Sequence, residues 1–251
     1  MESITEIKNI IDNTEDEALP EVITIYENDE RAGVQKLVEK AKNRFDKLQA
    51  EKERIQALSR YEKQYADYEF ICGIDEVGRG PFAGPVVAGA VILPKDCDIL
   101  YINDSKKLSE KVRERLYDEI SEKAISIGIG ISSPKRIDEI NILQATYEAM
   151  REAISKLDPV PTLLLNDAVT IPGVNIKQVP IVKGDAKSIS IGAASIYAKV
   201  TRDRMMKEYD KEFPGYGFSK NVGYGTAEHI EALKKLGPCP IHRFSFIHDY
   251  V

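Results

Sequence analysis

The chain has 251 residues, of which 43% are hydrophobic and 30% are charged, an ordinary balance for a globular protein. Its formal net charge is −6, so composition does not indicate nucleic-acid binding, although a local basic groove would still allow it. The three cysteines lie far apart without a CxxC pair, which argues against a cysteine-rich zinc site and for a reducing compartment. No apolar run approaches membrane-spanning length and no signal-peptide pattern is present, so we expect a cytoplasmic protein without a membrane partner.

Residues 1–68 differ in sequence pattern from the rest of the chain, and this pattern predicts a helical N-terminal extension. Ser3 is expected to cap a short first helix. A long charged helix is predicted over residues 28–65, because apolar residues recur there at alternating spacings of three and four. We favour a solvated helix packed on the main domain over an arm that binds a partner. The rest of the chain, residues 69–251, is expected to form one domain.

From residue 69 onward the sequence alternates between strands and helices. The first strand is a short apolar run that begins at Ile71, and Ser109 is expected to cap a helix that runs to about Ala124. The other predicted elements are strands at 85–93, 125–131, 162–167 and 174–182 and helices at 134–157, 188–213 and 227–236. A β-rich opening followed by this alternation predicts an α/β domain with a central mixed sheet flanked by helices on both faces.

Two adjacent carboxylates, Asp75 and Glu76, stand where the first apolar run stops. Buried carboxylates are costly unless a cation shares the site, and a salt-bridged strand end is the plain alternative to a functional one. Neighbouring side chains of a strand point to opposite faces, so both can serve one site only if the strand ends or twists here. Next comes Gly78-Arg79-Gly80, where an arginine suited to phosphate is flanked by residues that let a ligand approach the backbone. This order suits a metal-assisted site for a phosphodiester.

Two further carboxylates follow apolar strands. Asp167 ends the strand at 162–167, and Asp185 comes shortly after the strand at 174–182. Ligands of open α/β sheets bind outside the carboxyl ends of strands, so these groups are expected to face one crevice with the first pair. Oxygen ligands select Mg²⁺ or Mn²⁺, and two such ions can position a water and stabilise a leaving oxygen. Asp203 is the rival for the fourth place, although its helical, arginine-flanked position suits a structural ion pair better.

A longer match now points to a family. The residues from Asp75 to Val87 read Asp-Glu-Val-Gly-Arg-Gly-Pro-Phe-Ala-Gly-Pro-Val-Val and resemble the opening signature of type 2 ribonuclease H, bacterial ribonuclease HII. Later matches are Lys183-Gly184-Asp185, Gly223-Tyr224-Gly225-Thr226 and the Pro-x-His-Arg-x-Ser-Phe pattern at 240–246. The resemblance begins near Glu69 and implies a ribonuclease H-like fold for residues 69–251. It treats residues 1–68 as an extension of the kind that some bacterial members possess.

The resemblance also implies site residues. The metal site, with two ions of Mg²⁺ or Mn²⁺, maps to Asp75, Glu76, Asp167 and Asp185. The backbone and side chain of Gly78, Arg79 and Gly80 are implied to grip the ribonucleotide, and Tyr224 to stack on the sugar beside the cleaved bond. Tyr216 is a nearby decoy. Lys106, Lys183 and Arg202 are further candidates for contacts with phosphate, and each of them is equally plausible as a solvated surface charge. Ser188 and Ser195 are candidates for hydrogen bonds to phosphate from a helix start, although Ser195 fits tight helix packing equally well.

The implied activity is that of a metal-dependent endoribonuclease. It would hydrolyse RNA in RNA–DNA hybrids and nick duplex DNA on the 5′ side of embedded ribonucleotides, leaving 3′-hydroxyl and 5′-phosphate ends. We expect a monomer whose partner is nucleic acid. The nearest alternative is ribonuclease HIII, which usually has Gly-Thr-Gly at the position of Gly78-Arg79-Gly80 and a strand-rich N-terminal domain. A non-catalytic nucleic-acid-binding protein is disfavoured, because carboxylates without a metal would repel phosphate.

Overall fold

The computed structural model describes residues 2–251 and divides into two compact units. One unit ends at Ala57, and the other is Leu58–Val251. Within residues 2–251, none of the helices combines the length and the apolar character needed to cross a membrane.

The N-terminal unit is helical, as expected. It contains α1 (Ile4–Asn13), a short 3-10 turn (Asp16–Ala18), α2 (Leu19–Tyr26) and most of α3 (Ala32–Leu58). Ser3 caps α1 as predicted, and it forms a capping box with Glu6. The prediction of one helix over residues 28–65 is wrong, because α3 ends at Leu58 and a separate helix, α4 (Arg60–Gln64), follows. The buried core of this unit is formed by Ile7, Ile11, Leu19, Tyr26, Val34, Val38 and Ala41.

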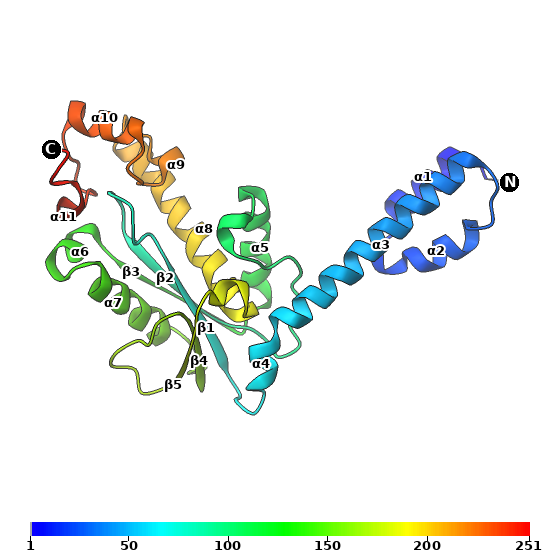
Figure 1. The fold of residues 1–251 in the computed structure, drawn as a ribbon, viewed down its shortest axis with the longest axis horizontal. Helices are drawn as coiled ribbons and strands as arrows, with labels where there is room; N and C mark the ends of the chain where they lie inside the picture. The colour runs from blue at the N-terminus through cyan, green and yellow to red at the C-terminus, as the bar shows by residue number, and fades with distance from the viewer. Residues whose placement is uncertain (1) are drawn as a thin grey trace. The chain divides into compact units, whose positions relative to one another are not determined.

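The larger unit is built on one five-stranded sheet (Figure 1). Its strands are β1 (Ile71–Val77), β2 (Val86–Ile92), β3 (Ser126–Ser132), β4 (Leu163–Asp167) and β5 (Lys177–Ile181), in the order β3-β2-β1-β4-β5. β1 is antiparallel to β2 and parallel to β4, and β4 is parallel to β5. The predicted mixed sheet is therefore confirmed. Because β1, β4 and β5 are parallel, their carboxyl ends meet at one edge of the sheet.

Helices cover both faces of this sheet, as expected. The helices of the larger unit after α4 are α5 (Glu110–Lys123), α6 (Pro134–Ile140), α7 (Ile142–Ser155), α8 (Ile189–Glu212), α9 (Phe218–Asn221), α10 (Ala227–Leu236) and α11 (Phe244–Ile247). On β1, Cys72 and Ile74 pack in the core cluster of α7, whereas Gly73 lies against α8. Successive strand residues alternate between faces, so α7 and α8 lie on opposite sides of the sheet (Figure 1). The predicted helix at 134–157 breaks at Asn141, which has a φ of 68° and caps α7 with its side chain.

Gly73 permits the closest approach between the sheet and α8. A Cβ at this position would lie 2.0 Å from the Ser190 carbonyl carbon and 2.3 Å from the Ile191 nitrogen. Both atoms are helix backbone, so they cannot move aside as a flexible side chain would. We expect Gly73→Ala to lower the free energy of unfolding by about 2–3 kcal/mol, as overpacking does, measured by urea denaturation. Gly80→Ala is the matched control, because its Cβ would meet nothing closer than 3.7 Å; equal losses in both variants would contradict this account of the contact.

Candidate active site

The two adjacent carboxylates lie on β1 itself and not beyond its end. The strand continues to Val77, so the expectation that it stops at Asp75 is wrong. Asp75 pairs with Gly89 of β2, and a Cβ on Gly89 would lie 2.6 Å from the Ala194 carbonyl oxygen of α8. Asp75 therefore points toward α8, where the Ser195 hydroxyl donates a hydrogen bond to its carboxylate. The backbone N–H of Glu76 donates a second one over 2.8 Å.

The other two predicted carboxylates are linked to each other through the backbone. Asp167 is the last residue of β4, and its Oδ1 accepts a hydrogen bond of 2.7 Å from the Gly184 N–H. Gly184 begins the 3-10 turn Gly184–Ala186, which contains Asp185. The charge of Asp167 acts on Asp75, Glu76 and Asp185 alike. The structure thus brings all four predicted carboxylates into one electrostatic group, in which Asp167 interacts with each of the other three.

The pKa values of this group show the cost of collecting negative charge. Burial raises the pKa of Asp75 well above its usual range, and the charges of Glu76 and Asp167 raise it further. Burial also raises the pKa of Glu76, against the lowering effect of the nearby Arg79. The pKa of Asp185 is raised by burial and then by Asp104 and Asp167. A bound cation would relieve this repulsion directly.

The donor set fits a hard divalent cation in its chemistry. The four groups offer only carboxylate oxygens, which suit Mg²⁺ or Mn²⁺ better than zinc. Within residues 2–251, however, no three His, Cys, Asp or Glu side chains are already arranged to hold a metal ion. The ligands that fit best, Asp75, Glu76, Asp167 and Asp185, would therefore have to draw closer together when a cation binds.

Two further polar groups lie next to the carboxylates: Asp104, which the sequence does not single out, and Ser195, a predicted phosphate contact that instead bonds Asp75. Asp104 raises the pKa of Asp185 and accepts a hydrogen bond of 3.0 Å from the Lys106 N–H. The hydroxyls of Ser105 and Ser195 lie 3.0 Å apart. Lys106, a predicted phosphate contact, is near enough to lower the pKa of Asp185. The polar run at residues 103–107 was visible in the sequence, but its position beside α8 depends on tertiary packing.

The predicted substrate loop and the predicted tyrosine lie side by side, although they are far apart in sequence. Gly78 has a φ of 89°, a left-handed conformation that favours glycine. Arg79 is exposed, and its Nη1 lies 3.2 Å from Glu76 Oε1. A Cβ on Gly80 would lie 3.7 Å from Cε1 of Tyr224, whose side chain is 44% exposed. A ligand at this loop can therefore meet the guanidinium, bare backbone and an aromatic ring together.

Tyr216, the decoy, differs from Tyr224 in its surroundings. It is only 7% exposed, and its hydroxyl donates a hydrogen bond of 2.6 Å to the Gly237 carbonyl. Its ring stacks on Phe218 with 5.2 Å between the ring centroids. These contacts are those of a core residue, so Tyr216 is not open to a ligand in this structure.

Two buried arginines, Arg243 and the predicted phosphate contact Arg202, hold the loop in place. Arg202 of α8 donates to the carbonyls of Pro85, Ala83 and Val222 at 2.9, 3.1 and 2.8 Å. Arg243 donates to the carbonyls of Gly84, Arg79 and Gly78 at 2.9, 2.9 and 2.5 Å. Burial lowers the pKa of Arg202 to about 10 and that of Arg243 to about 9, so both stay charged at neutral pH. The two side chains fix both ends of the turn between β1 and β2.

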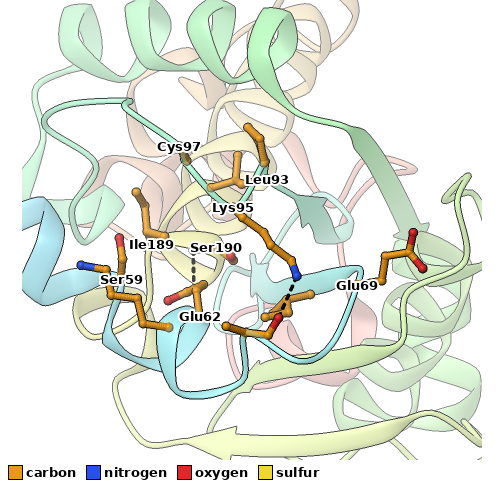
Figure 2. A pocket seen from close by; sticks show the side chains of 12 residues that line it. Ser59, Glu62, Glu69, Leu93, Lys95, Cys97, Ile189 and Ser190 are labelled. Carbon is orange, nitrogen blue, oxygen red and sulfur yellow. Dashed lines mark hydrogen bonds between the residues drawn. The ribbon is translucent and has the colours of Figure 1, made fainter.

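The remaining predicted phosphate contacts, Lys183 and Ser188, do not form a group with the carboxylates or the loop. Lys183 is exposed, with a φ of 58°. Ser188 is buried; its hydroxyl donates to Glu62 Oε1 over 2.5 Å and caps α8 by accepting from the Ile191 N–H. Figure 2 shows Glu62 reaching toward Ser190 beside a cavity between α4 and the start of α8. With its hydroxyl engaged in this way, Ser188 is placed as a capping residue, and its role as a substrate contact stays a prediction.

Asp203, the rival for the fourth metal ligand, forms ion pairs with two cations. Its carboxylate lies 2.7 Å from the Lys199 amine and 3.8 Å from the Arg113 guanidinium. Arg113 also donates to the carbonyls of Ser105 and Leu108. A carboxylate neutralised in this way has little need of a metal, so the structure supports its expected role as a structural ion pair.

Two of the three histidines, distant in sequence, form a buried pair. His229 Nε2 and His242 Nε2 lie 3.0 Å apart, and both side chains are almost completely buried. Burial and then the neighbouring His229 lower the pKa of His242 to about 4. Cys239, Tyr216 and Phe218 line the same cluster, and none of them supplies a negative charge at neutral pH. Both imidazoles are therefore neutral at pH 7.

This depressed pKa predicts a loss of stability in acid. In the unfolded chain His242 binds a proton below about pH 6.5, whereas in the folded chain it becomes protonated only near pH 4. Stability should therefore fall as the pH drops through this window, by at most about 3 kcal/mol. The measurement is the urea midpoint at pH 7 and pH 5 for the native protein and His242→Asn. The pH-dependent loss should shrink in His242→Asn and persist in a variant of the exposed His248; equal losses in all three would contradict the assignment.

Comparisons with known proteins identify the family of the chain. Residues 72–249 match the family model described as Ribonuclease HII, and residues 3–66 match the Ribonuclease HII N-terminal domain. Ribonuclease HII of Lachnoclostridium phytofermentans is 72% identical over 88% of this chain and 87% of its own length. Ribonuclease HII of Clostridioides difficile is 52% identical over 98% of this chain and 97% of its own. The solved ribonuclease H2 of Pyrococcus horikoshii is 28% identical, with a TM-score of 0.61 over 72% of this chain and 96% of that one, which confirms the predicted ribonuclease H-like fold.

Proposed function

The chain belongs to the ribonuclease HII family and is a ribonuclease H hydrolase, and from this premise we propose how its residues act. We propose that it is a metal-dependent endonuclease that cleaves RNA in RNA–DNA hybrids and nicks duplex DNA on the 5′ side of embedded ribonucleotides. The observation that supports this proposal best is the collection of Asp75, Glu76, Asp167 and Asp185 at one sheet edge. Beside it lies an arginine–glycine loop.

The four carboxylates are proposed to hold Mg²⁺ or Mn²⁺, with two ions in the complete site. When bound, such ions lower the pKa of a water and offset the charge that develops on the leaving oxygen. The chain's own contribution is to hold the ligands in place. Ser195 and the Glu76 N–H fix the Asp75 carboxylate, and the Gly184 N–H fixes that of Asp167.

Recognition of the ribonucleotide is proposed for the loop Gly78–Gly80 and Tyr224. The 2′-hydroxyl distinguishes RNA from DNA, and bare backbone at the exposed Gly80 lets it come within hydrogen-bond distance. At Gly78 the space of a missing Cβ is filled by the Arg202 side chain, so this glycine serves the shape of the loop. The Arg79 guanidinium would bind the adjacent phosphate, and the half-exposed Tyr224 ring would lie against the sugar. Lys106 is well placed for a further phosphate contact because it lies near Asp185, whereas the exposed Lys183 and the buried Ser188 have weaker support.

The proposed products follow from which bond is broken. Water attacks the phosphorus on the 5′ side of the ribonucleotide, and the bond between phosphorus and the 3′ oxygen of the preceding nucleotide breaks. That oxygen leaves as a 3′-hydroxyl, and the ribonucleotide keeps a 5′-phosphate.

The enzyme is proposed to act as a monomer in the cytoplasm, with residues 1–68 as an extension of a catalytic domain at 69–251.

The test is to map cleavage of a DNA duplex that contains one ribonucleotide, with Mg²⁺ or Mn²⁺ and with a chelator. We expect one nick 5′ to the ribonucleotide, no cleavage of the all-DNA duplex and no cleavage in chelator. Cutting of a long RNA–DNA hybrid without this nick would refute the proposed specificity but keep the metal site. Binding to both duplexes with no cleavage of either would favour the non-catalytic alternative.

A further inference from the structure

His229 and His242 lie directly behind Tyr224, and the proposed mechanism does not use them. His229 belongs to α10, and its Nδ1 lies 2.8 Å from the Tyr224 carbonyl oxygen. His242 Nδ1 lies 2.9 Å from the Cys239 backbone nitrogen and 3.1 Å from its sulfur. With the 3.0 Å contact between the two Nε2 atoms, these groups form one continuous chain from Cys239 to Tyr224.

The chain has one consistent hydrogen-bond direction. A carbonyl can only accept, so His229 must donate from Nδ1 to Tyr224, which leaves its Nε2 as a lone pair when the ring is neutral. His242 must then donate from Nε2 to His229, and its own Nδ1 becomes the acceptor. That acceptor receives the Cys239 backbone N–H over 2.9 Å; the Cys239 carbonyl lies farther from the same nitrogen, at 3.3 Å, and accepts from the His242 backbone N–H over 3.0 Å. A proton added to either ring would place two N–H groups against each other, so the chain requires both rings to be neutral.

The other hydrogen bonds of the Tyr224 backbone involve backbone groups, and the Asn221 side chain acts one residue earlier, accepting from the Gly223 N–H. The carbonyl of the preceding residue, Gly223, accepts from the Phe82 N–H over 2.8 Å, and the Tyr224 N–H donates to the Asn221 carbonyl. The Tyr224 carbonyl itself also accepts from the Thr226 N–H over 2.8 Å. The bond from His229 is therefore the one side-chain hydrogen bond shown to this peptide among the described residues, and it comes from a rigid helix.

We propose that His229 and His242 are positioning residues for Tyr224, and that they work as a one-directional chain of neutral imidazoles. His242 orients His229 and fixes its tautomer, and His229 holds the Tyr224 peptide so that the ring stays beside Gly80. The positioning claim rests on the proposed substrate role of Tyr224. The direction of the hydrogen bonds between the two histidines does not depend on that role, and it can be tested without any substrate.

The first test is the tautomer of each ring at pH 7, by long-range proton–nitrogen correlation NMR on the full chain. The protein contains three histidines, so its imidazole spectrum is simple, and the exposed His248 provides a reference. We expect the proton of His229 on Nδ1 and that of His242 on Nε2. A proton on His229 Nε2, or a cationic ring at either position, would overturn the proposed direction whether or not the enzyme cleaves any substrate.

The second test separates positioning from mere packing. His229→Leu removes the donor, whereas His229→Asn keeps an N–H at the place of Nδ1. We expect KM for the single-ribonucleotide duplex to rise about threefold to tenfold in the Leu variant, with a smaller change in kcat and near-native KM in the Asn variant. In a Tyr224→Ala background the Leu change should add nothing further to KM. An unchanged KM in His229→Leu, or an equal rise in the Tyr224→Ala background, would overturn the positioning role.

Discussion

Asp75→Asn is expected to lower the cleavage rate by on the order of 10³-fold or more, while the protein stays folded. Asp75 is the most enclosed of the four carboxylates, being only 7% exposed, and it lies between Glu76, Asp167 and the Ser195 hydroxyl. An asparagine keeps the shape and an acceptor oxygen but loses the charge that a divalent cation requires. Cleavage of an RNA–DNA hybrid under single-turnover conditions measures the loss.

The same substitution should not destabilise the protein. Burial and neighbouring charges raise the pKa of Asp75, which means that its ionised form costs the folded state free energy. A neutral amide removes that cost, so the urea midpoint should be equal to the native value or higher. Asp249→Asn, at an exposed surface position, is the control for both readouts. An Asp75→Asn enzyme that retains native activity would refute the metal assignment.

Arg202→Met is expected to cause the largest loss of stability, about 4 kcal/mol. The Arg202 side chain is completely buried and donates to three backbone carbonyls, at Ala83, Pro85 and Val222. Methionine fills much of the space but leaves these acceptors without donors. Because two of the carbonyls belong to the turn between β1 and β2, the variant should also raise KM for the substrate that contains a ribonucleotide.

Arg204→Met is the matched control, two residues further along α8. Arg204 is exposed and pairs with Glu114 at the surface, where an ion pair contributes about 1 kcal/mol or less. Urea denaturation and KM should therefore both separate the two variants. Similar losses of stability in Arg202→Met and Arg204→Met would show that the buried guanidinium does not hold the turn.

Most strands and helices could be predicted because their signals are local. Apolar runs such as 162–167 and caps such as Ser109 depend on near neighbours only, and the helix at 227–236 has the predicted bounds. The failures involve breaks that the apolar pattern does not reveal. Asn141 interrupts an otherwise continuous helical pattern by adopting a positive φ, and Pro20 is the second residue of α2, where the first turn tolerates a proline.

The residues of the site also fall into those with a local sequence signal and those without one. The four carboxylates and the glycine-flanked arginine could be named because the ends of apolar runs and glycine turns mark them in the sequence. The position of Asp104 could not be predicted, nor could the bond of Ser195 to Asp75 or that of Arg202 to Pro85, because all of them depend on contacts with residues distant in the chain. Nothing in the local sequence of His229 or His242 indicates that their rings meet.

The central claim is that Asp75, Glu76, Asp167 and Asp185 form one cation site, and calorimetric titration of Mg²⁺ and Mn²⁺ tests it most directly. We expect saturable binding to the native protein, weakened about tenfold or more in Asp75→Asn and in Asp167→Asn. Asp203→Asn should bind as the native protein does, because its carboxylate is already paired with Lys199 and Arg113. No saturable binding to the native protein, or equal binding in Asp75→Asn, would contradict the claim.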